Sequence, residues 1–106
     1  MKRFLFILLI IGMGAILSGC DQLKVAYWSA IAQSATNNGS FAKAEALYNK
    51  IVDLQPNVAE NYWQRGMLYI AMKESRKVLQ DSATLRKLKR NDLADQLEQL
   101  LRQIEE

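Results

Sequence analysis

The sequence predicts an all-α protein, and two observations lead to this prediction. From Val25 onward, apolar residues recur at the 3.6-residue spacing that gives a helix one apolar face. Short runs of turn-forming residues separate these stretches, with Gly39 in the first run and the only proline, Pro56, in the second. The pattern indicates short helices joined by tight turns, which pack as antiparallel hairpins.

The first hairpin is expected over residues 25–58. The apolar face of its first helix is Val25, Trp28, Ile31, Ala32 and Ala35. Gly39 suits the left-handed position after a helix, and Ser40 suits the N-cap of the next one. The second apolar face is Phe41, Ala44, Leu47, Tyr48, Ile51 and Val52. Pro56 follows that helix, because a proline disfavours helical geometry in the residue before it.

Three more helices are expected after Pro56. Asn57 with Glu60 three residues later is typical of a capping box, so a third helix should begin there. A fourth is expected from about Glu74 to Lys89. Asn91-Asp92 is expected to cap a last helix, whose apolar face is Leu93, Leu97, Leu100, Leu101 and Ile104. The opposite face is polar, as a terminal capping helix requires, and consists of Asp95, Gln96, Glu98, Gln99, Arg102 and Gln103.

Residues 25–58 resemble a tetratricopeptide repeat, a unit of about 34 residues in two antiparallel helices. The matching positions are Trp28, Ile31-Ala32, Gly39, Phe41, Ala44, Tyr48 and Pro56. Ala35 departs from the pattern, since the family usually has tyrosine there. Residues 59–90 resemble a degenerate second repeat that keeps Tyr62, Gly66 and Tyr69 but has departures at Lys73, Ser75, Ser82 and Arg90. Residues 91–106 would then form the capping helix.

The resemblance implies a partner-binding groove on the concave side of the helix stack. By their place in the repeat, its residues would be Ser29, Gln33, Thr36, Trp63, Met67 and Ile70. Trp63 has two interpretations: a contact for a protein partner, since tryptophan is enriched at interface hot spots, or ordinary core beneath the last helix. Family members that clamp a terminal carboxylate use lysine and asparagine, which Ser29 and Gln33 do not match, so that ligand is not expected.

The N-terminus has the features of a secretory signal. A positive start, Lys2-Arg3, precedes fourteen uncharged residues from Phe4 to Leu17, a run shorter than the roughly 20 residues of a membrane-spanning helix. Leu17-Ser18-Gly19-Cys20 resembles the lipobox of bacterial lipoproteins. The resemblance implies cleavage after residue 19 and attachment of a diacylglycerol and an N-acyl chain at Cys20. An uncleaved signal anchor with the same topology is the alternative.

The residues after Cys20 bear on location. Asp21-Gln22 resembles the signal that keeps lipoproteins of enterobacteria-like cells in the inner membrane; alternatively, Asp21 only begins a solvated linker over residues 20–24. We therefore expect lipid anchoring on the periplasmic or extracytoplasmic face of a bacterial membrane, with the inner membrane favoured in a Gram-negative cell.

Composition argues against catalysis and against nucleic-acid binding. Without residues 1–19, Lys2 and Arg3 are lost and 12 basic residues remain against 11 acidic ones, so the mature chain is nearly neutral. There is no histidine for Ser-His or His-metal chemistry, and the single cysteine allows no disulfide. Gly12 and Gly14 leave with the signal, so no phosphate cradle remains. We expect no enzyme activity, metal, cofactor or small-molecule substrate, apart from the covalent lipid.

One basic cluster, Arg86-Lys87 and Lys89-Arg90, has two interpretations. It could contact anionic lipid headgroups, or its charges could favour the negative end of the helix dipole. The second is preferred.

The expected function is that of a membrane-anchored adaptor or scaffold for a protein partner in an envelope, secretion, pilus or conjugation assembly. The alternative is a small structural or inhibitory lipoprotein, of the immunity or entry-exclusion type, with no groove ligand. About three repeats are normally needed to stack a stable core. We therefore expect the missing layer to come from a partner or from a second copy of the chain.

Overall fold

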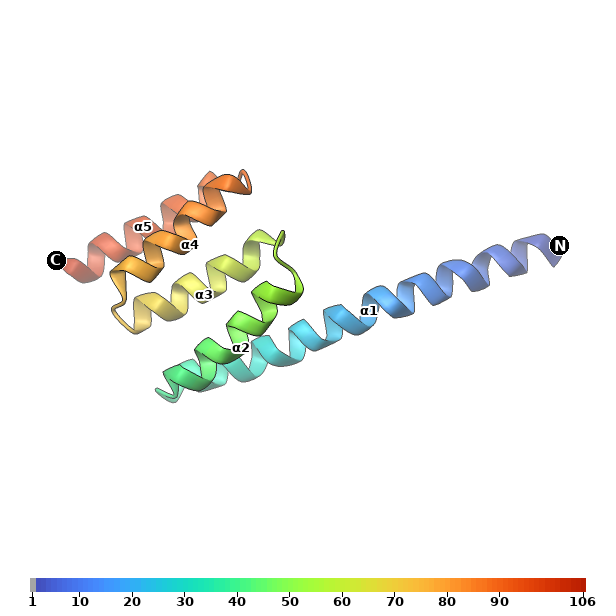
Figure 1. Ribbon diagram of the computed structural model, residues 1–106, viewed down its shortest axis with the longest axis horizontal. Helices are drawn as coiled ribbons and strands as arrows, with labels where there is room; N and C mark the ends of the chain where they lie inside the picture. Colours follow the sequence, from blue (N-terminus) through green and yellow to red (C-terminus); the bar gives the residue numbers. More distant parts are fainter. Residues whose placement is uncertain (1) are drawn as a thin grey trace.

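The computed structural model describes the backbone from Lys2 and the side chains from Cys20 to Glu106. The predicted signal and the lipobox positions before Cys20 lie outside these described side chains. The described chain forms five helices and no strand, which confirms the predicted all-α fold (Figure 1). The helices are α1 (Lys2–Asn37), α2 (Phe41–Leu54), α3 (Ala59–Ala71), α4 (Ser75–Lys87) and α5 (Asn91–Glu105).

The helices stack as antiparallel hairpins of the tetratricopeptide-like type. Each packs on the next along the chain, and α5 also packs against α3 (Figure 1). Residues 20–24, expected as a linker, instead continue α1 as helix. The lipid-attachment position predicted at Cys20 is therefore joined to the hairpins by continuous helix.

Two apolar clusters hold the stack together. The predicted faces of the first hairpin supply most of the first cluster. In α5, Leu97 and Leu101 are buried as predicted, whereas Ala94 is buried without having been predicted and Ile104 is exposed. The first cluster joins α1 and α2 to α3 through the buried residues Ala32, Ala35, Ala44, Tyr48, Ile51 and Leu68. The second joins α3, α4 and α5 through Ala59, Tyr69, Val78, Leu85, Ala94, Leu97 and Leu101. Including the half-buried residues around them, both clusters lie between Val25 and Leu101. The chain from Cys20 onward thus contains its whole described core.

Gly66 allows α5 to approach α3 closely. A Cβ added at Gly66 would lie 2.5 Å from Cδ1 of Leu97, which is fully buried. Real carbon atoms do not approach so closely, so a larger residue at position 66 would force the Leu97 side chain, or α5 with it, to shift. The resemblance to the repeat predicted a small residue at position 66. The structure shows why it is small: the Leu97 side chain occupies the space that a Cβ would need.

Three turns close in the same way, each on a residue with a left-handed backbone. Gly39 has φ +79°, as predicted, while Lys73 and Lys89 have φ +59° and +64°. After each, the next amide reaches back to the last helical turn: Ser40 N to Ala35 O (2.8 Å), Glu74 N to Tyr69 O (2.9 Å) and Arg90 N to Leu85 O (2.9 Å). These are Schellman turns, in which glycine is the preferred residue. The second and third turns therefore keep the turn geometry although glycine is missing.

Replacing Lys73 or Lys89 with glycine is expected to raise the free energy of unfolding by about 0.5–1 kcal/mol each, because glycine has no Cβ to strain the left-handed backbone. Urea denaturation measures the change. The control is Lys43→Gly inside α2, at an exposed position with helical backbone, where a loss of about 1 kcal/mol is expected. A loss of stability at all three positions would contradict the prediction.

The helix starts differ from those expected. The N-cap of α3 is Val58, so the prediction of Asn57 as N-cap of a capping box is wrong. The turn is instead held by Tyr62, whose hydroxyl donates to Pro56 O (2.7 Å), and by the Asn61 amide, which donates to Gln55 O (3.3 Å). Ser40 does precede α2, but its side chain makes no capping bond. The last helix begins at Asn91 with Arg90 as N-cap, so Asn91-Asp92 does not cap it.

Candidate functional site

A groove of about 420 Å³ lies between the C-terminal part of α1 and α3. Its lining residues are Gln33, Thr36 and Asn37 from α1, Tyr48 from α2, and Trp63, Gln64, Met67, Leu68 and Ala71 from α3. The resemblance to the repeat placed the partner-binding residues on these same two helices, in the C-terminal half of α1 and in α3.

Four of the six predicted groove residues line this groove: Gln33, Thr36, Trp63 and Met67. Ser29 lies at its edge, where its hydroxyl donates to Oε1 of the lining residue Gln64 (3.0 Å). Ile70 is not brought into the groove and instead packs, half-buried, against the second apolar cluster. Met67 packs against the same cluster but also lines the groove, whereas Ile70 contacts the cluster alone.

The sequence reasoning missed five lining residues: Asn37, Tyr48, Gln64, Leu68 and Ala71. Gln64, Leu68 and Ala71 follow the helical spacing of one face of α3, so a helical projection next to Trp63 and Met67 could have found them. Tyr48 belongs to α2, and only the packing of α2 beneath the other two helices brings it to the groove.

The groove carries no charged side chain on its lining residues. Its polar groups are amides and hydroxyls, and the Thr36 hydroxyl already donates to Ala32 O (2.8 Å). Burial raises the pKa of Tyr48, so this phenol stays protonated at neutral pH. The groove therefore suits an uncharged segment with apolar side chains, since nothing in its lining would compensate a buried ionic group.

Trp63 takes part in both environments that the sequence suggested. It lines the groove, and it also packs against the second apolar cluster on the side of α4 and α5. Its indole Nε1 is buried and has no hydrogen-bond acceptor among the described residues. Removal of the whole side chain would thus disturb the core as well as the groove, which bears on the choice of test variants.

A polar network between α2, α3 and α4 fixes the orientation of α3. Arg65 forms a salt bridge with the buried Asp81 (Nη2 to Oδ1, 2.6 Å). Glu45 accepts hydrogen bonds from Lys77 Nζ (2.9 Å) and from the Tyr69 hydroxyl (2.8 Å). Both bonds lower the pKa of Glu45, and the bond from Lys77 has the larger effect. The pKa of Tyr69 is raised, first by burial and second by its bond to Glu45. The network anchors the helix that supplies most of the groove lining.

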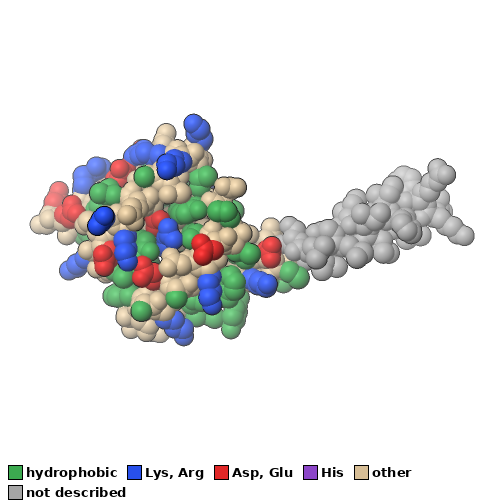
Figure 2. Space-filling model, viewed as in Figure 1, with side chains coloured by type: hydrophobic (Ala, Val, Ile, Leu, Met, Phe, Trp, Pro, Cys, Tyr) green, Lys and Arg blue, Asp and Glu red, His purple; other side chains and the backbone are tan. Residues whose placement is uncertain are grey.

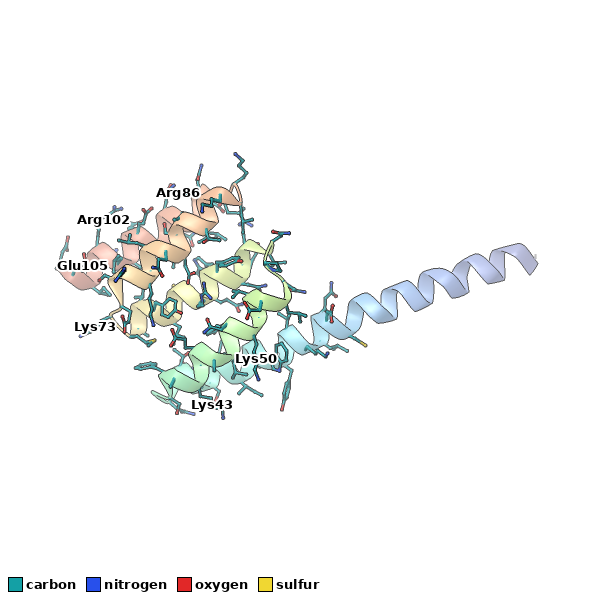
Figure 3. All side chains as sticks on the ribbon, viewed as in Figure 1. Lys43, Lys50, Lys73, Arg86, Arg102 and Glu105 are labelled. Carbon is teal, nitrogen blue, oxygen red and sulfur yellow. The ribbon has the colours of Figure 1, made fainter. Side chains whose placement is uncertain are left out.

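The basic cluster at the end of α4 is largely neutralised. Arg86 pairs with Asp95 (2.8 Å) and with Glu98, both on α5. Arg90 pairs with Glu60 (2.7 Å) and with its neighbour Asp92 (3.1 Å). Figure 3 shows Arg86 near one end of α4 and Lys73 near the other end. With its two arginines paired to acids, the cluster offers little net charge for anionic headgroups.

Cys20, the predicted lipid-attachment residue, is exposed, as are its neighbours Asp21 and Gln22. Across the residues that the structure describes, no helix has the length and apolar character needed to cross a membrane. The same part of the chain contains no cluster of three or more side chains able to hold a metal ion. Comparison with protein-family models, with curated proteins and with solved structures found no match to this chain.

Proposed function

We propose that this protein is a bacterial lipoprotein, anchored through Cys20, that holds a segment of a protein partner in the groove between α1 and α3. The observation that carries the proposal is the groove itself. Its volume of about 420 Å³ falls in the range of known ligand sites, and apolar residues and uncharged polar groups line it. Such a module acts as an adaptor in an envelope, secretion, pilus or conjugation assembly, and takes no part in catalysis.

The anchor is supported by the position of Cys20. Its side chain is exposed and belongs to neither apolar cluster, so acyl chains attached there would extend from the stack without disturbing its core. One acyl chain gives only marginal membrane binding, whereas two or more hold a protein stably. A lipidated Cys20 would thus keep the groove permanently at the membrane surface.

Blocking the groove should prevent partner capture. The double variant Gln33→Arg/Asn37→Arg places two charges in the uncharged groove at exposed positions outside both apolar clusters. The measurement is recovery of the partner after crosslinking in the native membrane and purification of the lipoprotein. We expect recovery to fall about tenfold or more, because a partner in the groove would bury the two added charges without a counter-charge. These positions are preferred to Trp63, whose removal would cost about 3–5 kcal/mol of stability.

The matched control is Ala42→Arg/Ala46→Arg, two exposed positions on α2. It should leave capture unchanged, and both double variants should unfold within about 0.5 kcal/mol of the parent. Capture that survives the groove variant would contradict the adaptor function and favour the structural or inhibitory lipoprotein.

Lipid attachment is tested by metabolic labelling with palmitate. The parent chain should incorporate label and, after removal of residues 1–19, should have the mass of residues 20–106 plus its acyl groups. Cys20→Ser should incorporate none, because only the thiol can form the thioether. An unlabelled parent of full length would instead indicate an uncleaved signal anchor.

A further inference from the structure

The outer face of α1 carries the most exposed large apolar residues of the described chain. Leu23 is 71 % exposed and Tyr27 is 65 % exposed, whereas the other large apolar residues on the surface are less than half exposed. Neither residue belongs to an apolar cluster. Figure 2 shows hydrophobic side chains, with an acidic and a basic one among them, where the described side chains of α1 begin.

These two residues share a helix face with Cys20. Positions 20, 23 and 27 are three and four residues apart, the spacing that places side chains in one row along a helix. The row continues through the exposed Ala30. Asp21 points about 100° away from Cys20, so the only charge beside the row is Lys24. A long lysine side chain can reach a polar headgroup while its stem lies on apolar surface.

The backbone here is continuous helix, which ties this row to the anchor. Because residues 20–24 belong to α1, acyl chains on Cys20 would start from the same helix face, one turn from Leu23 and two turns from Tyr27. A lipid surface is the one occupant that must be present beside this face once Cys20 is acylated. Tyrosine is enriched at membrane interfaces, and helices with one apolar face lie in the plane of the interface.

We propose that Leu23 and Tyr27 insert into the interfacial layer of the lipid bilayer, so that α1 lies along the membrane surface. This proposal rests on the anchor at Cys20 that the proposed function requires. The lipid anchor brings Leu23 and Tyr27 to the bilayer, and their insertion then fixes how the domain is rotated about the axis of α1. Gln33 of the groove lies about a quarter turn around α1 from Leu23. The groove would therefore open sideways along the membrane and select partner segments that run close to it.

The orientation can be tested without the cell's lipidation machinery. Cys20 is the only cysteine, so residues 20–106, which contain the whole described core, can be coupled through it to a maleimide phospholipid in phosphatidylcholine vesicles. Tyr27→Trp adds an indole to the row, and Ala83→Trp adds one at an exposed position of α4 as the matched control. Because Trp28 and Trp63 also fluoresce, each variant is compared with the parent chain. Vesicles with and without brominated acyl chains then report how deeply the added indole lies.

We expect brominated lipid to quench the indole added by Tyr27→Trp about twofold, as for a side chain inserted into the headgroup and acyl boundary. The indole added by Ala83→Trp should remain unquenched. Adding Leu23→Glu to the Tyr27→Trp variant should remove the quenching, since a carboxylate resists the interface. Equal quenching at positions 27 and 83 would overturn the proposal. A signal at position 27 that changes only with the surface density of protein would also overturn it, and would identify a second copy as the occupant.

Failure of this test and failure of the proposed function can be told apart. Palmitate labelling tests whether Cys20 is lipidated in the cell, and groove variants test partner capture. The vesicle experiment supplies the lipid chemically, so its outcome depends only on how the row meets the bilayer.

Discussion

Replacing Asp81 with alanine is expected to lower the free energy of unfolding by about 3–5 kcal/mol, the usual effect of removing one partner of a buried ion pair. Asp81 is only 1 % exposed. It accepts hydrogen bonds from Arg65 Nη2 to Oδ1 (2.6 Å) and from Nε to Oδ2 (3.1 Å). Without this carboxylate, the half-buried guanidinium would keep only its bond to Asn49 Oδ1 (3.0 Å). The unpaired charge, more than the lost bonds, accounts for the expected effect.

Urea denaturation of Asp81→Ala, of Asp81→Leu/Arg65→Met and of Asp95→Ala tests this account. The double variant removes both charges and fills their space, so it should recover most of the lost stability. Asp95, which is 70 % exposed, pairs with Arg86 at the surface, so Asp95→Ala should change stability by less than about 1 kcal/mol. A double variant as unstable as Asp81→Ala would show that packing, and not the unpaired charge, is responsible.

This pair also matters for the groove. Arg65 belongs to α3 and Asp81 to α4, and Arg65 lies over the ring of Tyr69 at 5.8 Å from its centroid. The pair therefore helps to set the rotation of α3, which presents Trp63 and Met67 to the groove. We infer that losing the pair would weaken partner capture even at temperatures where the variant stays folded.

Leu97→Ala is expected to destabilise the protein by about 2–5 kcal/mol, the range for a fully buried leucine in a well-packed core. Leu97 has no exposed surface, and its methyl groups occupy the space left open by Gly66 on α3. The contact holds α5 over the second apolar cluster. Shortening the side chain would leave a cavity between the two helices that the rigid hairpin of α4 and α5 can close only in part.

Thermal and urea unfolding of Leu97→Ala should be compared with Ile104→Ala near the end of α5. Ile104 is exposed and lies outside both clusters, so its replacement should change stability by no more than about 0.5 kcal/mol. A loss of similar size in both variants would mean that α5 is held by general contact along its length rather than by the fit of Leu97 to Gly66.

Much of the fold was predictable because its signals are local. The 3.6-residue spacing of apolar residues placed a helix within each of the five observed ones, and many of their buried positions, including Ala44 in α2 and Leu97 in α5. The residue types at Gly39 and Pro56 placed two of the turns. A helix needs only near neighbours to decide which face is apolar, so these features follow from short stretches of sequence.

The candidate site was less predictable because it depends on how the helices are rotated against one another. Gln33 and Met67 were found from their place in the repeat, but Tyr48 enters the groove from α2 and Ile70 leaves it for the second cluster. Asp81 gave no sign of its partner, since Arg65 lies sixteen positions earlier on another helix. Pairings of this kind are set by side-chain packing across helices, which a linear pattern does not record.

The sequence by itself determined that this chain is a short stack of helix hairpins, and which faces of the first two helices of the stack are buried. The tertiary structure decided the rest. It showed that Lys73 and Lys89 adopt the left-handed turns that Gly39 adopts freely, that α1 runs unbroken through Cys20, and that α1, α2 and α3 enclose an uncharged groove. The physical reason is that turn strain, helix rotation and groove shape arise from contacts between segments far apart in the chain, where the total packing energy outweighs each local preference.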